Sequence, residues 1–259
     1  AAARPGAEIH VATKPAYAEL LRHHPAVTQV HEFDSSLVRF GERLRAIGFT
    51  QVLDLHRNLR THRLRADLPG VSWSSFPKRN AEKWLLTNFK MNRLPVDEHI
   101  VERYARALRP LGIALDDGGL DLHLSEEAAA KAAAIWAEWQ PAQPVLAVVL
   151  GATYPTKQWL PEHHLATINA YGAPVLLLGG PAERETADWI ARQAQVPILN
   201  AAGRFDLLVS AALMQSAALV LTHDTGFMHV AAAFRQPSVV LWGNTVPAFG
   251  MGPYRSPHL

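Results

Sequence analysis

The sequence predicts an α/β protein built on parallel sheets. Short, continuously apolar runs alternate with helical patterns along most of the 259 residues. Runs that are apolar at every position are typical of parallel strands covered by helices on both faces. A stretch rich in proline and glutamine at residues 140–144 (QPAQP) divides the chain, so two domains are expected, at 1–140 and 141–259.

The first domain opens with a strand, and proline or glycine ends most of its helices. Pro25 follows the first helical pattern, Gly48 follows the second, and Ser125 is a suitable N-cap for the last. The expected elements, in order, are a strand at 8–13, a helix at 15–24, a strand at 27–33, a helix at 36–47, a strand at 51–55, and helices at 81–89, 98–111 and 125–139.

The second domain repeats the strand–helix alternation more regularly. Its strands are short apolar runs, as expected for a sheet that is buried on both sides. The expected strands lie at 145–150, 173–178, 196–200, 218–222 and 238–242, and the helices between them at 161–171, 182–195, 207–216 and 227–234.

Composition excludes several classes of protein. An apolar content of 49% with 19% charged residues is that of a folded globular protein. The absence of cysteine excludes disulfides, cysteine zinc sites and thiol nucleophiles. No run of 18 apolar residues occurs and the start has no signal-peptide core, which predicts a soluble or at most peripheral protein. The histidines lack metal-ligand spacing, so no metal site is expected.

Positive charge is concentrated in one segment. Residues 57–93 hold nine Lys or Arg side chains against two acidic ones, although the whole chain has a net charge of only +2. Such a segment favours an anionic partner such as a phosphate, an acidic sugar, a nucleic acid or a lipid surface. The alternative is a solvated basic face without a partner.

Familiar phosphate and catalytic motifs fail. Residues 151–157 (GATYPTK) resemble the opening of a P-loop, but they lack its second glycine, and Gln158 stands where Ser or Thr would bind magnesium. No GxGxxG follows a strand and no GxSxG is present. Nucleoside triphosphatase, dehydrogenase and α/β-hydrolase readings are therefore disfavoured.

One strand end carries the strongest signal. Residues 219–233 (LVLTHDTGFMHVAAA) read as an apolar strand, a short turn and a helix. A helix N-terminus offers free N–H groups to a phosphate, and Gly226 would let a ligand approach closely. Asp224, Thr225 and His229 lie around the same turn. The alternative is a capped helix, with Asp224 as N-cap and His229 half-buried.

Three further strand ends add polar or aromatic groups. Thr153 and Lys157 suit a pyrophosphate, Glu183 could accept hydrogen bonds from sugar hydroxyls, and Phe205 could stack on a base. Each also has a structural alternative: a surface loop, a carboxylate that stabilises a helix dipole, or a core aromatic. Together, in order along one sheet, they predict a cleft for a nucleoside diphosphate compound.

These motifs, taken together, resemble the family nine glycosyltransferases, the ADP-heptose:lipopolysaccharide heptosyltransferases and their relatives. The resemblance rests on 151–159, on GGPAE at 179–183, on GRF at 203–205, on DTGFMH at 224–229 and on WGNTVP at 242–247. The N-terminal half is similar more weakly, at RPGAEI (4–9), at His24-Pro25 and at VLDLHRNLR (52–60).

The resemblance implies a GT-B-like arrangement, with two Rossmann-like domains facing across a cleft. It also implies an inverting, metal-independent transfer of a heptose-type sugar from an ADP-sugar to a lipopolysaccharide core acceptor, with no cofactor. The second domain would bind the donor and the first the acceptor. Carried over by position, the donor residues are Thr153, Lys157, Glu183, Phe205, Asp224, Thr225, Gly226 and His229, with Lys157 stabilising the leaving group.

The resemblance leaves the catalytic base unassigned. The family's Asp base follows a first strand that would lie before Ala1, so we expect the first domain to be incomplete at its start and the chain to be catalytically poor. Asp54 is a conceivable substitute, but it is better placed to cap its loop. The alternatives are a non-catalytic nucleotide-sugar binding protein and, with less support, a nucleic-acid binder through residues 57–93.

The basic segment is assigned to the acceptor. Arg57, Arg60 and Arg63 follow the strand at 51–55 and are the expected contacts for an anionic lipopolysaccharide core. No nucleic acid partner is expected, because the aromatics near this segment are spaced for packing. The expected location is cytoplasmic, with peripheral contact at the inner membrane as a further option.

Overall fold

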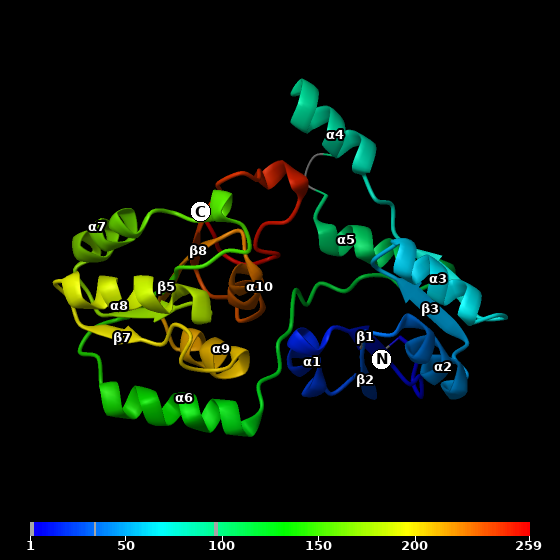
Figure 1. Ribbon diagram of the computed structural model, residues 1–259, viewed down its shortest axis with the longest axis horizontal. Coiled ribbons are helices and arrows are strands. Elements are labelled where there is room, and N and C mark those ends of the chain that lie inside the picture. The colour runs from blue at the N-terminus through cyan, green and yellow to red at the C-terminus, as the bar shows by residue number, and fades with distance from the viewer. Residues whose placement is uncertain (1–2, 34, 96–97) are drawn as a thin grey trace. The chain divides into compact units, whose positions relative to one another are not determined.

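The computed structural model describes residues 3–33, 35–95 and 98–259 and divides into two compact units (Figure 1). Unit 1 comprises Ala1–Asp117 with Ala248–Gly250, and unit 2 comprises Gly118–Pro247 with Met251–Leu259. Helix α6 (Glu126–Trp139) belongs to unit 2, because Trp136 Nε1 donates to the Leu213 carbonyl there (3.2 Å). The unit boundary therefore precedes the QPAQP stretch.

Unit 1 holds two pairs of parallel strands. β1 pairs with β2, and β3 pairs with β4. The elements are β1 (His10–Thr13), α1 (Pro15–Arg22), β2 (Gln29–Glu32), α2 (Leu37–Ile47), β3 (Gln51–Asp54), α3 (Leu59–Asp67), β4 (Ser72–Ser75), α4 (Asn80–Phe89) and α5 (Ile100–Ala105). Phe40 and Leu44 of α2 form its core with Leu68.

Two elements of unit 1, α3 and β4, were not predicted from the sequence. Helix α3 buries none of its residues, so it has no apolar stripe to reveal it. Its start is fixed instead by the side chain of Asn58, which accepts from the Thr61 N–H (3.1 Å). Strand β4 is polar (SWSS). The single helix expected at 98–111 is instead α5 followed by a 3-10 helix at Arg106–Leu111, which contains Pro110.

Unit 2 is a five-stranded, wholly parallel sheet in the order β7-β6-β5-β8-β9. All four residues of β5 and of β6 are buried, as their continuous apolar runs predict. The elements after α6 are β5 (Leu146–Val149), α7 (Pro161–Tyr171), β6 (Val175–Leu178), α8 (Arg184–Gln193), β7 (Ile198–Asn200), α9 (Leu207–Gln215), β8 (Leu219–His223), α10 (Gly226–Ala233) and β9 (Ser238–Leu241).

The strand order of unit 2 indicates where a ligand would bind. The chain runs outward from β5 through β6 to β7, then returns to build β8 and β9 on the other side of β5. Helices α7 and α8 pack together, while α9 packs against α6 and α10 (Figure 1). The connections diverge between β5 and β8, and ligands of such sheets bind beyond the strand ends at this switch point. The predicted α/β fold with parallel sheets is confirmed.

Among the described residues, no helix is both long and apolar enough to cross a membrane.

Candidate functional site

An ion pair occupies the switch point of unit 2. Lys157 Nζ lies 2.5 Å from Asp224 Oδ2, joining the loop after β5 to the loop after β8. The Thr245 hydroxyl donates to the same carboxylate oxygen at 2.8 Å, from the loop after β9. Three separate loops therefore meet at Asp224 and fix Lys157 at the carboxyl end of the sheet. Asp224 is only 9% exposed. The sequence placed Lys157 and Asp224 at one ligand site, and the structure brings them together.

The turn after β8 presents a helix N-terminus beside this pair. Helix α10 begins at Gly226, and the Thr225 hydroxyl accepts from the Phe227 N–H (3.2 Å). The N-cap is therefore Thr225, which corrects the alternative that Asp224 caps this helix. Asp224 faces Lys157 instead. Space around Gly226 is open and His229 is half-buried, so the first turn of α10 remains accessible to a ligand.

Glycines allow the loops of the site to approach closely. A Cβ on Gly243 would lie 2.5 Å from the Thr156 carbonyl oxygen and 3.0 Å from Lys157 Cα. Both atoms belong to backbone that cannot move aside, so Gly243 is needed to seat the loop that carries Lys157. The sequence shows Gly243 only as part of the WGNTVP motif and gives no sign of this role.

Glu183 lies at the ends of β5 and β6. Its carboxylate accepts from the Gly180 N–H at 2.7 Å and packs against Gly151, where a Cβ would lie 2.5 Å from Glu183 Cδ. The carboxylate therefore stabilises its own turn, as the structural alternative for Glu183 proposed. It is also half-buried at the strand ends.

Thr153 and Phe205 complete the set predicted for the donor. Thr153 is exposed in the loop after β5. Phe205 is half-buried before α9, with Lys131 Nζ 5.5 Å from its ring centre. Glu183 thus contacts Gly180 and Gly151, and Phe205 contacts Lys131. Lys157, Asp224 and Thr225 lie at the switch point.

A buried histidine pair underlies the Lys157 loop and was missed from the sequence. His164 of α7 and His223 of β8 are each 1% exposed, with ring centres 5.3 Å apart. His223 Nε2 accepts from the Trp159 N–H at 3.0 Å, which ties β8 to the residues that follow Lys157. The only sequence signal was a histidine at the end of an apolar strand.

Burial controls the protonation of this pair. Desolvation, with smaller contributions from His223 and His163, lowers the pKa of His164 to about 4. Burial also lowers the pKa of His223. His223 must be neutral at Nε2 to accept from Trp159, and the lowered pKa favours that form.

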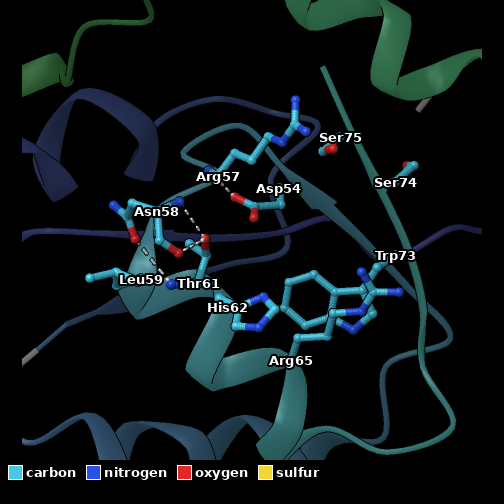
Figure 2. Close-up of a pocket in the computed structure, with 10 residues that line it drawn as sticks. All are labelled: Asp54, Arg57, Asn58, Leu59, Thr61, His62, Arg65, Trp73, Ser74 and Ser75. Carbon is cyan, nitrogen blue, oxygen red and sulfur yellow. Dashed lines mark hydrogen bonds between the residues drawn. The ribbon is translucent and has the colours of Figure 1, made fainter. Parts of the chain in front are cut away.

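Unit 1 contains a polar cavity of about 490 Å³ at the ends of β3 and β4 (Figure 2). Asp54 Oδ1 accepts from the N–H groups of His56 (2.9 Å) and Arg57 (2.7 Å), so Asp54 caps its loop as expected. The lining residues are Asp54, Arg57, Asn58, Leu59, Thr61, His62, Arg65, Trp73, Ser74 and Ser75.

The three arginines assigned to the acceptor have different surroundings. Arg57 lines the cavity, and its Nη1 donates to the Phe76 carbonyl at 3.3 Å. The Arg60 guanidinium lies 5.7 Å from the Phe33 ring centre, and Arg63 lies 3.9 Å from Asp67. The cavity adds two basic groups that were not predicted for it, His62 and Arg65.

No group of three or more His, Cys, Asp or Glu side chains within residues 3–33, 35–95 and 98–259 is arranged to hold a metal ion.

Comparison with known proteins identifies similar chains. The model of glycosyltransferase family 9 (heptosyltransferase) matches residues 37–257. Lipopolysaccharide heptosyltransferase 1 of Pseudomonas aeruginosa is 29% identical, over 96% of this chain and 74% of that protein. Lipopolysaccharide heptosyltransferase 2 of Escherichia coli is 31% identical over 41% of this chain and 33% of its own length.

Solved structures show the same fold. A family 9 glycosyltransferase from Veillonella parvula aligns with a TM-score of 0.83 at 23% identity, over 100% of this chain and 78% of that one. E. coli ADP-heptose lipopolysaccharide heptosyltransferase II aligns with a TM-score of 0.71 at 22% identity, over 100% and 82%. E. coli heptosyltransferase WaaC, solved with ADP, aligns with a TM-score of 0.69 at 22% identity, over 97% and 83%.

Proposed function

Because the chain belongs to glycosyltransferase family 9, we propose that it transfers a heptose-type sugar from an ADP-sugar to a lipopolysaccharide core acceptor, with inversion and without a metal ion. Heptosyltransferases similar to this chain, one of them solved with ADP, support this choice of donor and acceptor. The observation that carries the proposal is the fixed position of Lys157 at the switch point of unit 2, beside the N-terminus of α10.

Charge on the leaving group determines what the site must supply. When the acceptor oxygen bonds to the anomeric carbon, the bond from that carbon to the diphosphate breaks and ADP leaves with an additional negative charge. Lys157 and the positive end of the α10 dipole are already held in place, so they stabilise this charge with little reorganisation. The acceptor hydroxyl loses its proton as the new bond forms, and we propose no base for that step among residues 3–33, 35–95 and 98–259.

The other donor residues are assigned around Lys157. The Thr225 hydroxyl, Gly226 and His229 flank the first turn of α10, where the diphosphate is proposed to lie with Thr153. Asp224 orients Lys157 and is available to accept from a sugar hydroxyl. Glu183 is proposed to bind ribose or sugar hydroxyls. Phe205 is proposed to lie near the adenine.

The cavity of unit 1 is proposed as the acceptor site. Arg57 and Arg65 line it and give it the positive charge that an acidic sugar or phosphate requires, and His62 lies on the same wall (Figure 2). Arg60 and Arg63 lie on the same helix and contribute to the local field rather than to the cavity wall. We place the enzyme in the cytoplasm, where nucleotide sugars are made.

A nucleotide panel with a transfer assay tests the proposal. ADP and ADP-heptose should raise the melting temperature of the chain more than UDP, GDP or their sugars do. ADP should be released from ADP-heptose only when the acceptor is present, equally with and without EDTA, and NMR should show an inverted anomeric configuration in the product. Preferential binding of UDP or GDP would refute the donor assignment, and donor binding without transfer would favour a non-catalytic binding protein.

A further inference from the structure

Helix α4 carries an apolar face with no partner among the described residues of unit 1. None of its residues is buried, and Trp84 and Phe89 are 55% and 58% exposed. Their ring centres lie 5.2 Å apart, so the two aromatics form one patch, and Met91, two residues after Phe89 in the chain, is 44% exposed. In Figure 1, α4 stands away from the strands of its unit. Large exposed apolar groups gathered in one place mark an interaction site more often than scattered ones do.

A different side of α4 is anchored, which fixes the direction of the patch. Lys83 Nζ lies 5.4 Å from the centre of the Phe249 ring, in the same unit. Arg79, just before the helix, lies 3.0 Å from Glu82 and 3.6 Å from Glu98. Lys83 precedes Trp84 by one residue and therefore points about 100° away from it around the helix. The contacts hold the Lys83 side inward and leave the aromatic side outward.

The charge around the patch identifies its partner. Residues 78–93 contain five basic side chains and a single acidic one. That acid, Glu82, is already paired with Arg79, while Lys90 and Arg93 are exposed beside Phe89 and Met91. Aromatic rings next to exposed cations are the composition of a helix that lies in the interface of an anionic bilayer, with rings at headgroup depth and cations on phosphates.

We propose that α4, with the residues that follow it to Arg93, is a docking surface for an anionic phospholipid membrane. Trp84, Phe89 and Met91 enter the headgroup layer, and Lys90 and Arg93 contact lipid phosphates. This inference goes beyond the proposed activity and does not depend on it, because α4 contributes no residue to the donor site or to the acceptor cavity.

Vesicle cosedimentation of the full chain tests the proposal. The chain should bind vesicles that contain phosphatidylglycerol, bind pure phosphatidylcholine weakly, and be released by salt. The double variants Trp84→Ser/Phe89→Ser and Lys90→Glu/Arg93→Glu should each reduce partitioning about tenfold or more. Because α4 buries no residue, both variants should fold, and unchanged circular dichroism spectra and urea unfolding midpoints would verify that.

Matched controls use residues of equal exposure elsewhere. Tyr17→Ser removes an aromatic that is 54% exposed on α1, and Arg39→Glu/Arg192→Glu reverses two exposed charges on α2 and α8. These controls should bind vesicles like the unchanged chain. Trp84→Phe should keep binding but lose most of the fluorescence change on vesicle addition, since it removes the reporting indole while leaving an apolar ring.

Three results would overturn the proposal. The first is equal vesicle binding by the α4 variants and the unchanged chain. The second is a dimer that Trp84→Ser/Phe89→Ser dissociates, without vesicle binding, which would assign the patch to a second copy. The third is binding of single-stranded RNA in place of vesicles, lost on Lys90→Glu/Arg93→Glu.

Discussion

The pH dependence of stability should reveal the buried histidine of α7, His164. His164 is 1% exposed and its pKa is lowered from 6.5 to about 4. The unfolded chain therefore takes up a proton at His164 near pH 6.5, whereas the folded chain resists it until about pH 4. The unfolded state binds more protons between these values, so stability is full above pH 6.5 and falls as the pH falls.

The size of the effect follows from the shift. A difference of 2.5 pKa units corresponds to about 3 kcal/mol when the pH has fallen below 4, and to about 2 kcal/mol at pH 5. His164→Phe should remove this contribution, because phenylalanine keeps an aromatic ring against Trp159 and His223 but cannot take up a proton. The loss of stability between pH 8 and pH 5 should then shrink by about 2 kcal/mol.

The assay is urea unfolding at pH 8 and pH 5, followed by circular dichroism, with hydrogen exchange of the β5 and β8 peptides to report on unit 2. His163→Phe is the matched control, because His163 is the next residue along the chain but is exposed. The control should keep most of the pH dependence. If His164→Phe loses as much stability on acidification as the unchanged chain, His164 is not buried in its neutral form and the reasoning is refuted.

Three further predictions concern single contacts. His223→Leu should lower the free energy of unfolding by about 1–3 kcal/mol, because the Trp159 N–H loses its acceptor. His223→Gln should keep most of that stability, because the glutamine side chain can accept the same hydrogen bond. Equal urea midpoints for the two variants would count against the hydrogen bond. Gly151→Ala should displace the Glu183 carboxylate and weaken ADP-heptose binding several-fold. Stability should fall by less than about 1 kcal/mol, since the atoms in the way end a flexible side chain. An unchanged affinity by calorimetry would contradict a donor role for Glu183. Phe40→Ala should cost unit 1 about 3–5 kcal/mol, measured by urea unfolding, and a loss below 1 kcal/mol would show that Phe40 is not central to that core.

The fold of unit 2 was predictable because its strands are mainly apolar and two of them, β5 and β6, are apolar at every position. β5 and β6 are buried throughout, and such runs have no other common explanation in a chain of alternating elements. In unit 1, α3 and β4 escaped because neither carries an apolar pattern: α3 depends on the Asn58 cap, and β4 on its pairing with β3. Local propensity cannot reveal elements that tertiary contacts stabilise.

The grouping of Lys157 with Asp224 could be predicted from the sequence, but the contacts around them could not. Residues at the ends of parallel strands lie at one edge of the sheet, so Lys157 and Asp224 could be grouped from order alone, and the family they indicated is confirmed. The contributions of Thr245, His223 and His164 depend on which loops meet, and that is set by the strand order rather than by any motif. The alternative in which Asp224 caps α10 could not be excluded from the sequence for the same reason, since only the structure shows that its carboxylate faces Lys157.

Calorimetric titration of ADP into the full chain, the Lys157→Ala variant and an Arg192→Ala control tests the central claim most directly. Lys157 is held at the switch point by Asp224, whereas Arg192 is an exposed cation on α8 of the same unit. A charge-assisted contact to phosphate is worth about 1.5–3 kcal/mol, so Lys157→Ala should weaken ADP binding about 10–100-fold and Arg192→Ala should leave it unchanged. Equal ADP affinity for all three proteins would contradict a diphosphate site at Lys157.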